Sequence, residues 1–184
     1  MSEGKTQLSS FNNAWYNPGA SFLKRGLWFC LNNAFFCSRF PFSAFKVVLL
    51  RMFGARVGEK VIIRPGVNIK APWFLEISDN VWIGENVWID NLIKISIASD
   101  CCISQGAMLL TGNHDYSKST FDLVTKSIVL EEGVWIGAKA VVCPGVICHS
   151  HALLTVASVA TSNLEAYGIY QGNPAVKIKE RKII

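Results

Sequence analysis

Residues 130–158 read LEEGVWIGAKAVVCPGVICHSHALLTVAS, in which an apolar residue recurs at every sixth position. Neither a helix nor an ordinary alternating strand has this period, whereas a short fixed repeat is typical of a solenoid. Val134 and Ile136 share one face of an extended strand, while Trp135 between them points the opposite way. Each six-residue unit is therefore predicted to hold one short strand and one bend, and three units would close one coil of a parallel β-helix.

The same period extends back to Val57. It resumes after a two-residue slip at Ile77 and after a second slip at Ile97. The repeat predicts about five coils around a narrow aliphatic interior, spanning residues 55–162. The period fails within residues 111–127, which are predicted to form a polar loop inserted on the binding face of the solenoid.

The chain before the repeat is rich in hydrophobic residues and carries scattered basic residues. A polar, loosely ordered lead of about twenty residues is predicted, followed by helices at 22–36 and 43–53, the second with Ser43 as N-cap and Gly54 as its stop. We interpret residues 1–54 as this lead and helices that cap the open end of the β-helix, where an unpaired strand edge must be covered. The alternative is peripheral contact with an anionic membrane surface, faced by Lys24, Arg25, Arg39, Lys46 and Arg51.

Composition narrows the function classes. Of the 184 residues, 51% are hydrophobic and 17% are charged, so one well-packed domain is expected. The net charge of +5 is mild and favours an anionic cofactor over nucleic acid. We predict neither a membrane span nor a signal peptide. The six cysteines show no C-x-x-C spacing, so buried thiols of a cytoplasmic protein are expected.

The alternation forces three tryptophans outward, because Trp82, Trp88 and Trp135 each lie between two inward residues. Three exposed indoles on one small solenoid predict buried interfaces. The flat sides of a prism suit packing against copies of the same chain, so a cyclic oligomer, a homotrimer, is expected. The alternative is that these indoles lie beneath the helices or the inserted loop. Trp135 would also suit the wall of a site.

The histidines divide into a pair and a single residue. His149 and His151 are predicted to share a strand face near Cys148, but a metal site needs three or four convergent ligands, so no metal is predicted. His114 lies in the inserted loop beside Asp115. A neutral histidine is a competent general base, and a partner on its other ring nitrogen would fix the tautomer. A solvated loop histidine is the alternative. Candidates for the partner are Asp115, Asp90, Asp100, Asp122 and a backbone carbonyl.

Several motifs resemble those of hexapeptide-repeat acyltransferases. They are the hexads, TGNHDY at 111–116, VWIGA at 134–138 and GNPA at 172–175. Over about residues 43–182 the chain is similar to the maltose, galactoside and nodulation-factor O-acetyltransferases, and within these to the colanic acid biosynthesis acetyltransferases. That subgroup also carries stretches like LRMFGA at 50–55 and APW at 71–73. The resemblance implies an all-β, left-handed β-helix and a homotrimer with each active site between neighbouring subunits.

The resemblance also implies a reaction and residues for it. The enzyme would transfer an acetyl group from acetyl-CoA to a sugar hydroxyl in cell-surface polysaccharide synthesis. His114, with Asp115 beside it, would take the hydroxyl proton, and Asp90 with Asn91 would contact the acceptor. The backbone N–H of Ala138 would stabilise the developing oxyanion. The other positions expected along coenzyme A are Trp135, Gly137, Val156, Thr161, Ser162, Asn173, Lys177 and Lys179.

The C-terminal segment, residues 163–184, is expected to form a turn and a basic tail. Here the chain departs from the family pattern, since SNLEAY follows Thr161 and Val176 follows Ala175 where members carry basic residues. The contacts to the coenzyme A phosphates are therefore the weakest part of the resemblance. Two alternatives remain: an acetyltransferase of the same fold that acts on an amino sugar or serine, and a non-catalytic trimeric binding or scaffold protein.

Overall fold

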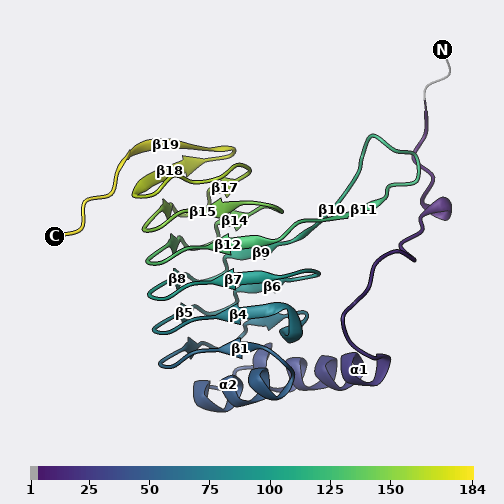
Figure 1. The fold of residues 1–184 in the computed structure, drawn as a ribbon, viewed down its shortest axis with the longest axis horizontal. Helices are drawn as coiled ribbons and strands as arrows, with labels where there is room; N and C mark the ends of the chain where they lie inside the picture. The colour runs from purple at the N-terminus through teal and green to yellow at the C-terminus, as the bar shows by residue number, and fades with distance from the viewer. Residues whose placement is uncertain (1–3) are drawn as a thin grey trace.

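The computed structural model describes residues 4–184, and its strands stack into a three-sided prism (Figure 1). Sheet 1 contains β1 (Arg56–Val57), β4 (Leu75–Ile77), β7 (Ile95–Ile97), β12 (Ile128–Leu130) and β15 (Ile147–Cys148). Sheet 2 contains β2 (Ile62–Ile63), β5 (Trp82–Ile83), β8 (Cys102–Ile103), β13 (Trp135–Ile136), β16 (Leu153–Leu154), β18 (Gly168–Gly172) and β19 (Ala175–Glu180). Sheet 3 contains β3 (Asn68–Ile69), β6 (Trp88–Asp90), β9 (Met108–Leu110), β14 (Val141–Val142) and β17 (Val159–Ala160).

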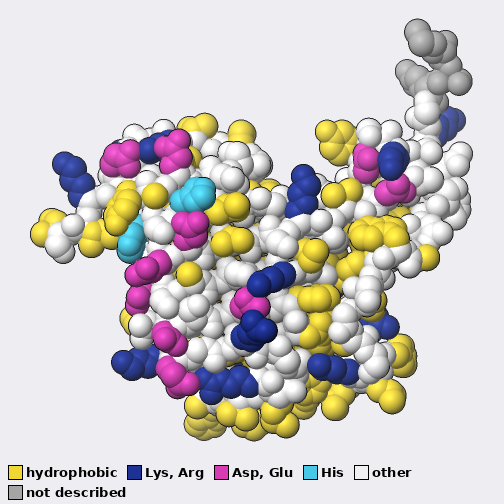
Figure 2. Space-filling model, in the orientation of Figure 1, with side chains coloured by type: hydrophobic (Ala, Val, Ile, Leu, Met, Phe, Trp, Pro, Cys, Tyr) yellow, Lys and Arg dark blue, Asp and Glu magenta, His cyan; other side chains and the backbone are white. Residues whose placement is uncertain are grey.

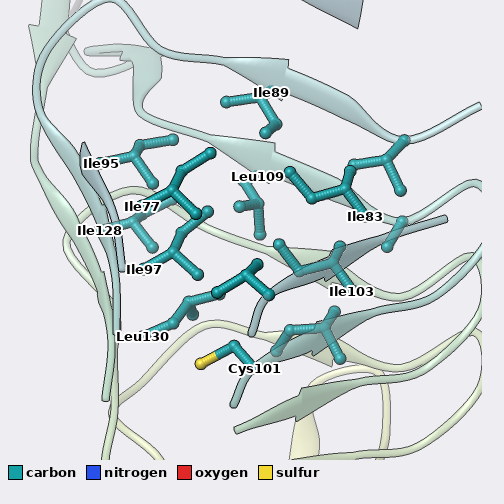
Figure 3. Packing of buried hydrophobic residues seen from close by; sticks show 14 of the residues in the cluster. Ile77, Ile83, Ile89, Ile95, Ile97, Cys101, Ile103, Leu109, Ile128 and Leu130 are labelled. Atoms are coloured by element: carbon teal, nitrogen blue, oxygen red, sulfur yellow. The ribbon is translucent and has the colours of Figure 1, made fainter. Parts of the chain in front are cut away.

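The chain visits the sheets in the order 1, 2, 3 in each coil, and successive coils pair in parallel. The prediction of a left-handed parallel β-helix with N-terminal helices and an inserted loop is confirmed. Identical positions stack in register, as Ile63 on Ile83 and Ile83 on Ile103 do in sheet 2. All three side chains are fully buried, and those of Ile83 and Ile103 point into the narrow interior (Figure 3). The six-residue period is therefore the rule that returns an aliphatic side chain to the same core position in every coil.

The two slips in the period have a simple structural origin. In sheet 1, Val57 pairs with Ile77 and Ile77 with Ile97, so the register continues across both slips. The added residues lengthen β4 and β7, which each place a second buried side chain in the core, Leu75 and Ile95. The slips therefore widen one side of the coil and do not break the stack.

Helices close the first coil of the prism. They are α1 (Phe22–Leu31), the π-helical turn η2 (Asn32–Phe36) and α2 (Ser43–Met52). The Trp28 Nε1–H donates to the Ile69 carbonyl at 2.8 Å, and Lys46 Nζ donates to the Arg64 carbonyl at 2.9 Å. The first coil has no preceding coil to bond to, so these side chains satisfy its open edge. The capping interpretation is thereby supported.

Two details of the helix prediction differ in their outcome. Gly54 ends α2 as expected, with φ +99° and an N–H bonded to the Arg51 carbonyl. The assignment of Ser43 as N-cap is wrong, because Ser43 is already helical and the cap position is Phe42. The Ser43 Oγ instead accepts from the Ile63 N–H at 2.8 Å, which fastens the helix to the first coil.

The described parts of both terminal segments are more ordered than predicted, and the first three residues of the predicted lead lie outside the described residues. The N-terminal lead includes the short helix η1 (Leu8–Ser10), and the Gln7 N–H donates to the Ser119 carbonyl at 2.8 Å. The predicted basic tail is largely strand β19, which forms an antiparallel hairpin with β18 over the last coil. Beyond it, Arg181 Nη1 donates to the Gly133 carbonyl at 2.9 Å. Within residues 4–184, none of the helices has the length and apolarity to cross a bilayer.

Candidate active site

His114 lies on an arm that projects from the prism (Figure 1). The arm is the antiparallel hairpin β10 (Gly112–His114) and β11 (Leu123–Thr125), inserted after sheet 3. Its base is fixed by Thr111, which is fully buried. The Thr111 Oγ1 donates to the Asp90 carbonyl at 2.9 Å and accepts from the Leu92 N–H at 2.8 Å. The preceding coil therefore determines where the arm begins.

The imidazole of His114 is held on two sides by Phe121. Its Nδ1 lies 2.8 Å from the Phe121 carbonyl oxygen, and its ring stacks on the Phe121 ring at 4.3 Å between centroids and 5° between planes. A carbonyl only accepts, so Nδ1 carries the proton and the lone pair of the neutral ring is on Nε2. Phe11 of the N-terminal lead closes a further side at 5.6 Å. A backbone carbonyl is thus the orienting partner among the candidates.

Asp115 is adjacent to His114 but is bonded elsewhere. Its Oδ1 accepts from the Ser117 N–H at 3.0 Å and from the Ser117 hydroxyl at 2.5 Å. These hydrogen bonds, the hydroxyl's first, hold the pKa of Asp115 below its usual range. Across the part of the chain described, no hydrogen bond joins Asp115 to His114. Asp115 therefore shapes the tip of the arm and does not fix the imidazole.

Asp90 ends β6, the strand of sheet 3 next to the base of the arm, and Asn91 follows it, but their environments differ. Asp90 Oδ1 pairs with Lys70 Nζ at 2.8 Å at the rim of a groove. Asn91 is fully buried, where its Oδ1 accepts from the Ala71 N–H and its Nδ2 donates to the Ala71 carbonyl. The structure thus leaves Asp90 at the surface and uses the Asn91 amide to fix the corner beneath it.

The groove beside Asp90 has a volume of about 390 Å³ and lies between α1 and sheet 3. Aromatic rings and charged side chains meet in it, which suits a ligand with both a ring face and polar groups. Leu92 joins its wall to the arm, since a Cβ on Gly112 would lie 2.5 Å from Leu92 Cδ1. Lining residues are Tyr16, Arg25, Lys70, Trp73, Trp88 and Asp90.

A second set of predicted residues lies at the corner between sheets 2 and 3. Here Gly137 and Ala138 follow β13, and the Lys139 and Ala157 amides bond to the carbonyls of Gln105 and Ala138 in the coil before each. A Cβ on Gly137 would lie 2.7 Å from the Leu154 carbonyl oxygen of the next coil, so no side chain fits. Within residues 4–184 the Ala138 N–H has no hydrogen-bond acceptor. It is a backbone donor available at the surface.

Two neighbours extend this corner. Trp135 is exposed on sheet 2, where its Nε1 donates to the Ser104 hydroxyl at 2.9 Å. Val156 is exposed in the next coil, stacked above Ala138. The Gly172 N–H donates to Ser158 Oγ at 3.0 Å, which brings the turn of Asn173 onto the same corner stack.

The two lysines expected near coenzyme A phosphates have different surroundings. Lys177 Nζ pairs with Glu165 and with Glu180, both at 2.7 Å. These hydrogen bonds raise the pKa of Lys177 and neutralise its charge locally. Lys177 is therefore already bonded to carboxylates of its own chain, and its contact with a phosphate stays a prediction. Lys179 lies on β19 opposite Ile169 and forms no ion pair within the described chain.

One chain does not bring the two halves of the predicted site together. Asp90 ends β6 of sheet 3, and the arm with His114 follows β9 of that sheet. Thr161 and Ser162 likewise follow β17, whereas Ala138 and Val156 precede strands of sheet 3. The two sets lie at opposite edges of sheet 3, by which we mean the two opposite ends of its strands. The predicted base and the predicted oxyanion donor therefore belong to different corners of the prism.

The His149 and His151 pair is also placed differently from its prediction. Both lie in a bend, His151 with φ +60°, and they do not share a strand face. His149 Nδ1 lies 3.1 Å from Glu131 Oε1, while Cys148 is buried inside the prism. Residues 4–184 contain no group of three or more metal-ligating side chains.

Comparison with known proteins identifies the family. No protein-family model matches the chain. A protein of Escherichia coli K12, provisionally named colanic acid biosynthesis acetyltransferase, is 35% identical over 175 residues, which cover 95% of this chain and 96% of that protein. The chain belongs to the hexapeptide-repeat acetyltransferases. It is therefore an acetyltransferase, and the resemblance stated from its motifs is confirmed.

Solved structures agree with this fold. The hexapeptide-repeat acetyltransferase of Vibrio cholerae O1 biovar eltor, determined with acetyl coenzyme A, superposes with a TM-score of 0.80 at 22% identity, over 90% of this chain and 92% of that chain. A galactoside acetyltransferase in complex with coenzyme A gives a TM-score of 0.77 at 21% identity, over 87% of this chain and 82% of that chain. At these identities the likeness concerns the fold.

In this hexapeptide-repeat acetyltransferase, reasoning from sequence included a backbone carbonyl among the candidate partners of His114 but did not identify Phe121 as the residue that supplies it. Phe121 has φ +52°, a left-handed backbone conformation that turns its carbonyl toward His114. The available signal was an aromatic residue inside an otherwise polar loop. Phe11 was also missed, because its partner lies more than a hundred residues away in the chain.

Proposed function

We propose that the protein transfers the acetyl group of acetyl-CoA to a sugar hydroxyl, in the synthesis of a cell-surface polysaccharide. The observation that carries this proposal is the fixed imidazole of His114, whose Nδ1 is occupied by the Phe121 carbonyl and whose Nε2 lone pair is therefore available. The 35% identity to the colanic acid protein over nearly the whole chain supports the choice of acceptor class. The named function of the galactoside acetyltransferase supports a sugar as well.

In the proposed reaction His114 Nε2 removes the proton of the acceptor hydroxyl as its oxygen attacks the thioester carbonyl. The C–S bond then breaks, and the imidazolium returns the proton to the departing thiolate of coenzyme A. The Ala138 N–H stabilises the negative charge that develops on the carbonyl oxygen. Asp115 acts indirectly, through the shape of the arm. No step requires a metal or a covalent enzyme intermediate.

A homotrimer completes the site. Because His114 and Ala138 lie at opposite edges of sheet 3, the arm of one subunit must meet the corner of a neighbour. The outer face of sheet 2 suits such an interface, since Ile62 and Trp82 are exposed on neighbouring strands and Trp135 lies two strands further along. Exposed apolar side chains aligned along a flat sheet favour burial against another copy.

The acceptor would lie in the groove beside Asp90. A carboxylate at the rim can accept hydrogen bonds from sugar hydroxyls, and the Trp88 ring, 40% exposed, offers an apolar surface for a sugar ring. The pantetheine arm would follow the corner of Gly137, Val156 and Asn173 beside Trp135, with Thr161 and Ser162 contributed at the other edge. Lys177 and Lys179 are the proposed phosphate contacts, and Lys179 is the one that forms no ion pair within the described chain. The six cysteines are free, in keeping with a reducing cytoplasm as the site of the reaction.

The test is thiol release from acetyl-CoA against a panel of sugars and nucleotide sugars. We expect His114→Ala to lower kcat by about 10²-fold or more with coenzyme A binding retained. Tyr116→Ala, a change at an exposed side chain of the same arm, is the matched control and should keep full activity. Equal activity of His114→Ala and the wild type would refute the base, and preference for an amine acceptor would refute the hydroxyl.

A further inference from the structure

The two N-terminal helices expose a large apolar surface on the side away from the prism, which we call the basal face. Phe22, Leu23 and Met52 are 79%, 81% and 71% exposed, and Leu27, Phe29, Phe42, Phe45 and Val48 are also exposed. Hydrophobic side chains line the lower edge of the molecule over α1 and α2, with basic side chains just above them (Figure 2). Exposed apolar surface this concentrated marks an interaction site.

Capping the prism does not account for the basal face. The inward side of α2 carries Val47, Leu49, Leu50 and the buried Lys46, and these residues already cover the first coil. Phe45, Val48 and Met52 follow the helical spacing on the opposite side. The same is true of α1, in which Trp28 is buried on the prism while Leu23 and Leu27 face away. Each helix is thus apolar on both sides.

The helices of the basal face and the segments that flank them in the sequence carry charges of one sign. Residues 4–58 contain seven Lys or Arg and no Asp or Glu. Lys24, Arg25 and Arg39 form no ion pair within residues 4–184. Arg51 and Arg56 are paired with Glu59 and Glu76, which belong to the prism. An apolar stripe beside unpaired cations is the pattern of a helix that lies in the interface of an anionic bilayer.

The same charges argue against a second copy as the partner. A symmetric contact between two basal faces would bring the helices of two copies together, and residues 4–58 of each copy carry basic charges only. A face that is apolar and cationic needs an apolar and anionic partner. A bilayer with acidic headgroups supplies both over an extended flat surface.

We propose that the basal face binds the surface of an anionic membrane, with α1 and α2 lying in the headgroup region. The groove beside Asp90 shares Arg25 and Phe29 with this face, so docking places that groove at the bilayer surface. One side of α1 and α2 then caps the prism, and the opposite side contacts the membrane. This inference goes beyond the proposed acetyl transfer and does not depend on it.

The test is co-sedimentation of the full chain with vesicles of phosphatidylcholine alone or mixed with phosphatidylglycerol, without acetyl-CoA or acceptor. We expect sedimentation with the anionic vesicles that weakens as salt is raised. The variant Phe22→Ser/Leu23→Ser/Leu27→Ser should weaken this binding by about tenfold or more, because three exposed apolar side chains are lost. Lys24→Gln/Arg39→Gln should weaken it on anionic vesicles only.

The matched control is Val176→Ser/Ile178→Ser/Ile183→Ser, which removes three exposed apolar side chains at the other end of the prism and should bind as the wild type does. Unchanged thermal unfolding of each variant verifies the fold. The proposal is overturned if the wild type stays in the supernatant with anionic vesicles, or if the α1 variant sediments equally well. It is also overturned if, without lipid, the wild type forms an assembly larger than the proposed trimer and the α1 substitutions dissociate it. A second copy would then cover the basal face.

Discussion

The Nδ1 of His114 lies 2.8 Å from the carbonyl oxygen of Phe121, whose ring is stacked on the imidazole. One residue thus fixes both the tautomer and the plane of the proposed base. The arrangement uses a backbone oxygen, which cannot titrate, where a carboxylate would serve in many other sites. It also requires a left-handed backbone at Phe121, where glycine would be favoured.

Substitution of Phe121 separates these two contributions. Phe121→Gly keeps the backbone conformation and the carbonyl but removes the stacked ring, and we expect kcat to fall by about tenfold through looser orientation of His114. Phe121→Ala should fall further, because alanine costs about 1–2 kcal/mol relative to glycine in the left-handed region and lacks the stacked ring that holds phenylalanine there. Steady-state kinetics of both variants provide the measurement. A larger loss for glycine than for alanine would contradict this account.

The role of Asp115 can be separated from proton transfer by the pH dependence. Bonds from Ser117 lower the pKa of Asp115, so its support of the arm is present above the ordinary value of 3.8 and is lost as pH falls through the lowered value. Ser117→Ala should raise the Asp115 pKa measured by NMR titration. Asp115→Asn should leave the pH profile of kcat in place. A displaced acid limb in that variant would mean that Asp115 acts on His114 after all.

Subunit mixing tests whether the site spans two chains. Ala138→Pro removes the N–H donor, and proline is compatible there because Pro65-Gly66 occupies the equivalent corner of the first coil. We expect this variant to fold normally and to lose about 10²-fold in kcat. Co-assembled with His114→Ala, it should recover about a quarter of wild-type activity, from interfaces that combine the intact arm with the intact corner. No recovery in verified mixed trimers would place both groups in one chain.

The buried Lys46 gives a stability signature. Burial lowers the pKa of Lys46, so between that lowered value and the ordinary 10.5 the unfolded chain binds more protons than the folded one. Stability should therefore rise with pH in this window, and Lys46→Met should flatten the rise. Thermal unfolding of the two proteins at a series of pH values measures the difference. Parallel curves would show that Lys46 titrates as it does in the unfolded chain.

Substitution by alanine should change the stability in opposite directions at Gly137 and at Gly26. Gly137→Ala places a Cβ 2.7 Å from the backbone of the next coil, and we expect a loss of about 1–3 kcal/mol together with loss of activity. Gly26→Ala lies in α1 with no atom within 4 Å of the new Cβ, and it should gain up to about 1 kcal/mol in helix propensity. Denaturant unfolding decides, and destabilisation of both would contradict the steric argument.

The sequence predicted the prism well because one physical rule governs it. A side chain at every sixth position must fill the same narrow core, so Ile63, Ile83 and Ile103 are readable as a set. The corner residues follow from the same counting. His114 was found because it stood in the segment where that rule fails.

The parts that could not be predicted depend on contacts without a period. Phe11 reaches His114 from the other end of the chain, and the Lys177 side chain is held by Glu165 and Glu180. Neither contact corresponds to a regular spacing in the sequence, because each depends on how separate segments pack against the folded prism. The distance between the two edges of sheet 3 is likewise a property of the folded coil.

The hydrogen bonds from Trp28 and Lys46 to the first coil have a consequence for how the chain behaves outside its native state. Each coil presents a row of backbone N–H and C=O groups to the next coil at strand spacing. The repeat itself contains no feature that ends this stacking. The helices end this row at one side of the molecule. A chain that lacked both α1 and α2 would leave this row open, and the same stacking that builds the prism would recruit strands from other molecules into a fibre.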